Sequence, residues 1–177
     1  FDPRRIDVMN RVARLVRTLP RSFSGPQLVR TFASGDKPFK RKPGVSSPAE
    51  LKAFVDAARA NGQEVIVVDA RNPDFGVEPG DEGMSKEFPI AQTLKGYRVR
   101  AINVPFNRVT KSLDIERIPK EWIEQAGGKS DVSIITHCGS GGRGEKSKQF
   151  LLTNGFKKVL NGGGPGDSEC WSEFGHL

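Results

Sequence analysis

Cysteine, histidine and long apolar runs are all scarce in this 177-residue chain. Its two cysteines are too few for a disulfide framework, and a reactive thiol among them would need a reducing compartment. Its two histidines do not combine with cysteines or carboxylates at metal-ligand spacing, so we expect neither a metal nor another cofactor. No apolar run approaches the length of a bilayer crossing, and we expect no transmembrane span.

Positive charge is plentiful, but only in the first quarter of the chain. Residues 1–45 contain 11 Lys/Arg and 3 Asp/Glu, a net charge of +8, whereas residues 46–177 contain 17 and 18, a net charge of −1. Proteins that follow a phosphate backbone need a basic excess, which residues 46–177 lack. We therefore expect no nucleic-acid partner, and we divide the chain into a basic extension, 1–45, and a domain, 46–177.

The extension begins with a pattern typical of an amphipathic helix and continues as a linker. Apolar residues recur at spacings of three and four between Arg4 and Leu19, among interspersed arginines, and Pro20 ends the pattern. An Arg-rich, acid-poor start is typical of an organelle transit sequence, which predicts a mitochondrial location, with a plastid or cytoplasmic location as alternatives. The competing interpretation is a retained arm that docks on an acidic partner in a protein complex or on a membrane surface.

Strand and helix patterns alternate through the domain. Ser47-Pro48-Ala49-Glu50 has the spacing of a capping box, which predicts a helix up to Asn61-Gly62. Further helices are predicted over 86–94, broken by Pro89, over 113–126, where Pro119 separates a turn from the helix proper, and over 145–152. Strands are predicted over 64–69, 98–104, 132–136 and 158–160. This order predicts an α/β fold with a mostly parallel sheet covered by helices on both faces.

The segment from Ile134 to Gly144 is the most informative part of the chain. An apolar strand delivers Cys138 into a glycine-rich loop that ends at Arg143 and leads into a helix. Strand, tight loop and helix start form an anion cradle of backbone N–H groups, and this environment favours the thiolate, which is the nucleophilic form. A buried structural cysteine is the alternative, and it applies with more force to Cys170. Strand alternation directs His137 away from Cys138 and into the core.

The chain resembles the rhodanese-like sulfurtransferases in four sequence blocks that occur in the family's order. The blocks are the six-residue loop 138–143, the helix and "G-F/Y-x-x-V" strand with its double glycine over 148–163, the "DVR"-like strand end 67–71 and the "GAINIP"-like segment 101–105. Together they place about residues 46–175 in that family. The resemblance implies a rhodanese-like α/β domain of the single-domain type.

The resemblance also implies residue roles. Cys138 would be the catalytic residue that takes up sulfane sulfur as a persulfide. The substrate and the persulfide's negative charge would be held by Gly139, Ser140, Gly141, Gly142, Arg143 and Gly144. Arg143 either binds the anionic end of the donor or braces the loop by pairing with Asp69. Asp69 is expected to support the site rather than act as a general base, and Arg71 either recruits the donor or lies solvated at the strand end.

Three functions follow from this resemblance. In the first, a small anionic donor such as thiosulfate loads Cys138, and a thiol or cyanide unloads it. In the second, the domain is a non-catalytic or weakly catalytic subunit of a larger mitochondrial complex. In the third, the same cysteine serves a phosphatase, but phosphatases of this fold have five residues between cysteine and arginine, whereas four separate Cys138 from Arg143.

Overall fold

The computed structural model describes residues 40–77, 81–91 and 98–177. The helices in that part of the chain are α1 (Pro48–Ala60), α2 (Glu82–Glu87), α3 (Lys120–Gln125), α4 (Gly142–Thr153) and α5 (Ser168–Phe174), with a short 3₁₀ turn, η1 (Ile115–Arg117). The strands are β1 (Ile66–Asp69), β2 (Ala101–Asn103), β3 (Ser133–His137) and β4 (Lys158–Asn161). The predicted helix over 86–94 includes residues 92–94, which lie outside the described residues.

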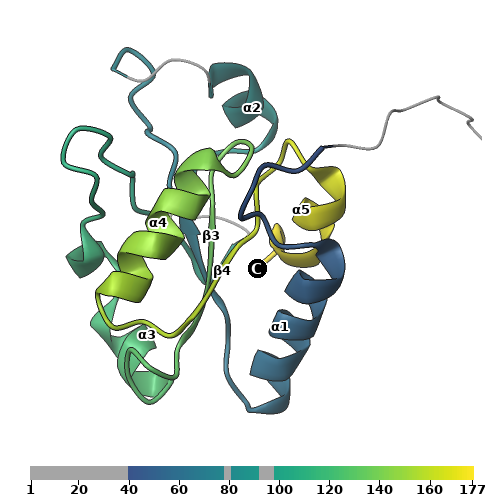
Figure 1. The fold of residues 1–177 in the computed structure, drawn as a ribbon, viewed down its shortest axis with the longest axis vertical. Coiled ribbons are helices and arrows are strands. Elements are labelled where there is room, and N and C mark those ends of the chain that lie inside the picture. Colours follow the sequence, from purple (N-terminus) through teal and green to yellow (C-terminus); the bar gives the residue numbers. More distant parts are fainter. Residues whose placement is uncertain (1–39, 78–80, 92–97) are drawn as a thin grey trace, which may run out of the picture. The chain divides into compact units, whose positions relative to one another are not determined.

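The strands form a parallel sheet in the order β2-β1-β3-β4. Figure 1 shows α1 and α5 on one side of this sheet and α3 and α4 on the other. The predicted α/β fold is therefore confirmed. In this order β1 and β3 are the central strands, and parallel strands present their carboxyl ends at one edge, where sites in such folds lie.

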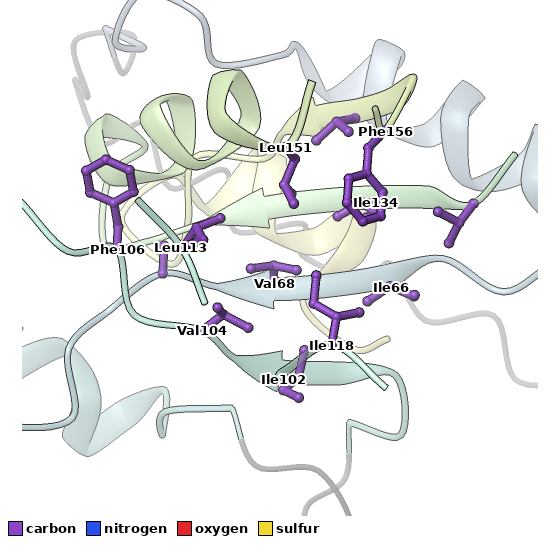
Figure 2. Packing of buried hydrophobic residues seen from close by; sticks show 13 residues of the cluster. Ile66, Val68, Ile102, Val104, Phe106, Leu113, Ile118, Ile134, Leu151 and Phe156 are labelled. Carbon is purple, nitrogen blue, oxygen red and sulfur yellow. The ribbon is translucent and has the colours of Figure 1, made fainter. Parts of the chain in front are cut away.

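The central strands are buried on both faces, as their unbroken apolar sequence requires. Alternate side chains point to opposite faces, so Ile66 and Ile134 join one core cluster, whereas Val67 and Ile135 join the other. Figure 2 shows the first cluster, in which the strand side chains pack against Leu151 of α4. Burial of each such side chain contributes about 1.5–3 kcal/mol.

Helix α1 begins as the sequence predicts. The Ser47 hydroxyl accepts a hydrogen bond from the Glu50 backbone N–H at 3.3 Å, and the Glu50 carboxylate accepts one from the Ser47 N–H at 2.7 Å. Pro48 occupies the first turn, where its missing N–H is harmless. The capping box is therefore confirmed.

Three helices differ from the predictions. The helix predicted over 86–94 overlaps α2 only at Lys86 and Glu87, because α2 ends before the predicted break at Pro89, which drives the preceding Phe88 out of helical geometry (φ −123°, ψ 85°). Helix α4 begins at Gly142, three residues before the predicted start. Helix α5 was not predicted, although Asp167 caps it by accepting a hydrogen bond from the Cys170 N–H at 3.2 Å.

Contacts with the domain begin a few residues before the predicted boundary at residues 45 and 46. Residues 1–39, including the predicted amphipathic helix, lie outside the described residues. The segment that follows is part of the domain: Arg41 pairs with Asp167 at 2.8 Å, and the Lys42 ammonium donates to the Ser140 hydroxyl at 2.8 Å. Among the described residues, no helix is long and apolar enough to cross a membrane.

Candidate active site

Strand β3 carries Cys138 to the carboxyl edge of the sheet, where the chain turns sharply into α4. Gly141 makes this turn with a φ of +96°, a conformation that suits glycine, and α4 begins at the next residue. The backbone N–H of Gly141 donates to the Cys138 sulfur at 3.2 Å. The sulfur is thus held at the base of the loop, and Cys138 is only 3% exposed.

Strand β4 and the glycines after it hold this loop from behind. The Asn161 side chain donates to the Gly141 carbonyl at 3.1 Å and accepts from the Gly163 N–H at 3.1 Å. The Cys138 N–H donates to the Gly163 carbonyl at 3.0 Å. Gly164 lies so close to the Cys138 carbonyl that a side chain there would overlap it. Gly163, the second residue of the double glycine in the sequence pattern, and Gly164 therefore hold the backbone of Cys138 in place.

A cleft of about 340 Å³ opens over the cysteine. It is lined by Lys42, Asp81, Arg108, Cys138, Gly139, Ser140, Gly142, Arg143 and Lys146. Among the described residues these include four cationic side chains and one carboxylate, so the cleft favours an anion. Of the predicted loop residues, the cleft brings together Cys138, Gly139, Ser140, Gly142 and Arg143.

Arg143 braces the loop, but its partner differs from the predicted one. Its guanidinium pairs with the carboxylate of Asp81, at the start of α2. Helix α2 also lies over the loop, because a Cβ on Gly139 would meet Met84 Sδ at 3.2 Å. The Arg143–Asp81 pair therefore joins the loop to the element that covers it, and the predicted pairing of Arg143 with Asp69 is wrong.

Asp69 and Arg71 form a buried ion pair beside the site. The Arg71 guanidinium donates to Asp69 at 2.7 Å and to the carbonyls of Phe88 and Pro89 at 2.8 and 3.1 Å, and both side chains are fully buried. Burial opposes ionisation of Asp69, but His137, Arg71 and the Ala91 N–H lower its pKa to about 2. Neither residue lines the cleft, so both predictions for Arg71, as a donor-binding or a solvated arginine, are wrong.

His137 points into the core, as strand alternation predicts. Its ring packs edge-on against Trp171 at 5.1 Å between centroids. Burial lowers the pKa of His137 to about 4, so the ring is neutral at neutral pH. A neutral ring can donate from Nδ1 to the Cys138 carbonyl at 3.1 Å and accept at Nε2 from Arg98 at 3.4 Å. His137 thus supports the backbone of the cysteine and is turned away from its sulfur.

The second cysteine is a core residue. Cys170 is fully buried in α5, and its thiol donates to the Ser46 carbonyl at 3.3 Å. Burial raises the pKa of this thiol to about 11, which keeps it protonated. Cys138 is therefore the nucleophile candidate. No cluster of three or more His, Cys, Asp or Glu residues suited to a metal occurs in the described ranges.

Sequence reasoning missed five residues of this region. Lys42 was assigned to the linker, and nothing in the spacing of Asp81, Arg108 or Asn161 pointed to the site. Lys146 had a usable signal, because it follows Arg143 by three residues and therefore shares its helix face.

Comparison with known proteins identifies the family of this chain. The sequence model of the rhodanese-like domain matches residues 47–164. A search of curated proteins gave no match. A solved structure described as that of an uncharacterized protein from Saccharomyces cerevisiae is 24% identical, with 75% of this chain and 93% of that chain covered and a TM-score of 0.37. A sheet that sets a cysteine at the base of a glycine loop, together with the family match over two thirds of the sequence, places this chain in the rhodanese-like domain family.

Proposed function

We propose that this protein is a sulfurtransferase that carries sulfane sulfur on Cys138. The observation that supports this most directly is the position of the Cys138 sulfur, which accepts the Gly141 N–H at the base of a cleft rich in cations. A backbone N–H and nearby positive charge both favour a sulfur anion. An anionic donor would therefore be drawn to the one sulfur that can attack it.

Loading is a single displacement at sulfur. The Cys138 thiolate attacks the outer sulfur of thiosulfate, a new S–S bond forms, and the S–S bond of thiosulfate breaks. Its electron pair leaves with sulfite, so that thiolate plus thiosulfate gives persulfide anion plus sulfite, with charge conserved. No proton moves in this step.

Unloading repeats the displacement with the acceptor as nucleophile. Cyanide or a thiolate attacks the outer sulfur of the persulfide, and the Cys138 thiolate leaves. The products are thiocyanate or the acceptor's own persulfide, again with balanced charge. This chemistry suits a cleft whose described lining contains no histidine and whose one carboxylate, Asp81, is paired with Arg143.

The test is to incubate the purified protein with thiosulfate and to measure its intact mass by mass spectrometry. We expect one added sulfur atom on the wild type, none on Cys138→Ser, because a hydroxyl does not form a persulfide, and one on Cys170→Ser. Cyanide should remove the added sulfur as thiocyanate. A wild type that takes up no sulfur would contradict the proposal and favour a non-catalytic subunit.

The same preparation separates sulfur transfer from phosphatase activity. Hydrolysis of an aryl phosphate should be negligible, because the loop has one residue fewer than a phosphatase loop of this fold and Arg143 is paired with Asp81. Efficient hydrolysis that is lost in Cys138→Ser, without persulfide formation, would reverse the assignment.

A further inference from the structure

The segment 41–46, here called the strap, runs into α1 along the domain and passes beside α5 (Figure 1). It is fixed at both ends. Arg41 pairs with Asp167 at 2.8 Å and also with Glu169. At the other end, the Ser46 N–H donates to the Asn161 carbonyl at 2.9 Å. A segment anchored on both sides of a short turn holds that turn in a fixed place.

The turn between these anchors directs Lys42 at the loop of Cys138. Pro43 and Gly44 occupy its central positions, Gly44 has a φ of +83°, and the Val45 N–H donates to the Lys42 carbonyl at 3.2 Å. This is the pattern of a type II turn. From it the Lys42 ammonium reaches the Ser140 hydroxyl at 2.8 Å and lies 3.7 Å from where a Cβ on Gly142 would stand.

Lys42 is exposed, and the charged groups around its ammonium are mostly positive, since the one carboxylate in the described lining of the cleft, Asp81, is paired with Arg143. Gly142 is the first residue of α4, a twelve-residue helix whose N-terminus carries partial positive charge. Arg143 and Lys146 of the same helix, and Arg108, line the same cleft. A lysine amine held here beside positive groups would be stabilised by a negatively charged ligand between them.

We propose that the strap completes the donor site and that Lys42 makes the cleft select donors with two negative charges over donors with one. The inference rests on the proposed sulfur transfer. It adds that the donor bound at that site carries two negative charges. With the outer sulfur of the donor against Cys138, the sulfonate end lies towards the mouth of the cleft, where Lys42 is held. The second charge of thiosulfate is on that end, and the departing sulfite keeps it.

The test compares two donors that deliver the same sulfur. Thiosulfate is a dianion that leaves as sulfite, and methanethiosulfonate is a monoanion that leaves as methanesulfinate. Lys42→Gln removes the charge and keeps the length of the side chain. We expect it to lower kcat/KM for thiosulfate about tenfold, the size of one charge-assisted hydrogen bond. The fall for methanethiosulfonate should be less than about threefold, so that the preference for the dianion shrinks.

Two matched variants define the result. Lys40→Gln makes the same charge change at an exposed position just before the strap and should leave both donors unaffected. Lys42→Arg keeps the charge and should retain most of the preference for thiosulfate. Equal losses with both donors, or the same loss in Lys40→Gln, would overturn the assignment, because either result means a general effect of charge.

A binding measurement separates this inference from the proposed function. In a Cys138→Ser background no sulfur can be transferred, yet sulfate should still raise the melting temperature by binding the cleft. Lys42→Gln should reduce that rise and Lys40→Gln should not. If sulfate binding is unchanged by Lys42→Gln, the role of Lys42 is wrong even where wild-type loading succeeds. If sulfate binding depends on Lys42 but wild-type loading fails, the proposed function is wrong and the anion site stands.

Discussion

At the scale of single residues, the site depends on glycines that other side chains approach closely. A Cβ on Gly144 would lie 2.5 Å from Asn161 Oδ1 and 3.2 Å from the Cα of His137. At Gly142, two residues earlier in the same helix, the nearest atom outside the helix is Lys42 Nζ at 3.7 Å, an ordinary contact. A substitution by alanine is therefore expected to have different effects on stability at these two positions, although they lie only two residues apart.

Gly144→Ala should destabilise the fold and Gly142→Ala should not. The added methyl at position 144 has to push α4 away from β4, at a cost of about 1–3 kcal/mol. The methyl at position 142 meets only a flexible side chain and improves helix propensity. Urea unfolding of both variants measures the difference. Equal stability of the two would mean that α4 is not seated against Asn161 as described.

The sequence indicated Cys138 as the nucleophile candidate and predicted the loop around it, but not the side chains that other segments bring to the cleft. Cys138 was recognisable because a strand, three glycines, an arginine and a helix start coincide around it. Arg71 was misplaced because nothing local reveals that residues 88–91 fold over it and supply carbonyl partners. Lys42 was missed because its role depends on a turn and two anchors whose partners lie more than a hundred residues away. Long-range partners of this kind have no periodic signature.

At the scale of secondary-structure elements, buried polar groups tie several elements together behind the site. Asp69 of β1, His137 of β3 and Arg71 meet there, and Trp171 of α5 covers the His137 ring. The Ala91 N–H adds a further donor to Asp69 at 3.0 Å. The strands were predictable from their apolar runs, but α5 and the exact place of α2 were not, because their short sequences carry little periodicity and tertiary contacts fix them.

This network makes the fold sensitive to acid in a defined range. In the folded chain His137 becomes protonated only when the pH nears its pKa of about 4, whereas in the unfolded chain it becomes protonated below about 6.5. Stability therefore falls as the pH drops from 6.5 to 4, by an amount on the order of 3 kcal/mol. A further loss follows between 3.8 and about 2, where the unfolded chain protonates Asp69 first.

His137→Gln should flatten the first part of this dependence. The urea midpoint of the variant is expected to be lower at neutral pH, since the ring packing is lost, and to change less between pH 7 and pH 4.5. His176→Gln is the matched control, because that ring is exposed on the surface, and its profile should follow the wild type. If the urea midpoint of His137→Gln changes with pH as steeply as that of the wild type, groups other than His137 cause the acid sensitivity.

At the scale of the whole molecule, contacts with the domain begin earlier in the chain than the boundary that charge and composition indicate. The basic excess extends to Lys42, but the folded domain already includes Arg41 and Lys42. Charge composition reports on solubility and partners rather than on packing, so it could not locate this boundary. We propose that residues 1–39 supply the mitochondrial targeting predicted from their sequence, whereas the strap belongs to the rhodanese-like domain.

Two truncations test this division. A chain that begins at residue 40 should melt like the full chain and keep its sulfur transfer, but a fluorescent fusion should lose its mitochondrial location. A chain that begins at residue 47 lacks the strap; it should melt lower and lose at least as much kcat/KM for thiosulfate as Lys42→Gln. Equal behaviour of the two truncated chains would place the functional boundary where the sequence alone put it.

The strand order has a consequence for when the chain becomes reactive. Strand β3 lies between β1 and β4 in the sheet, and Ile66 of β1 pairs with Ile134 of β3, which is distant in the sequence. Parallel pairings between distant segments require closure of long loops, which makes them slow to form. The Gly141 N–H, the Asn161 brace and the strap meet at Cys138 only after this closure. During synthesis the chain therefore lacks the contacts that hold Cys138 at the base of its loop, and under the proposed function persulfide formation would report that folding is complete.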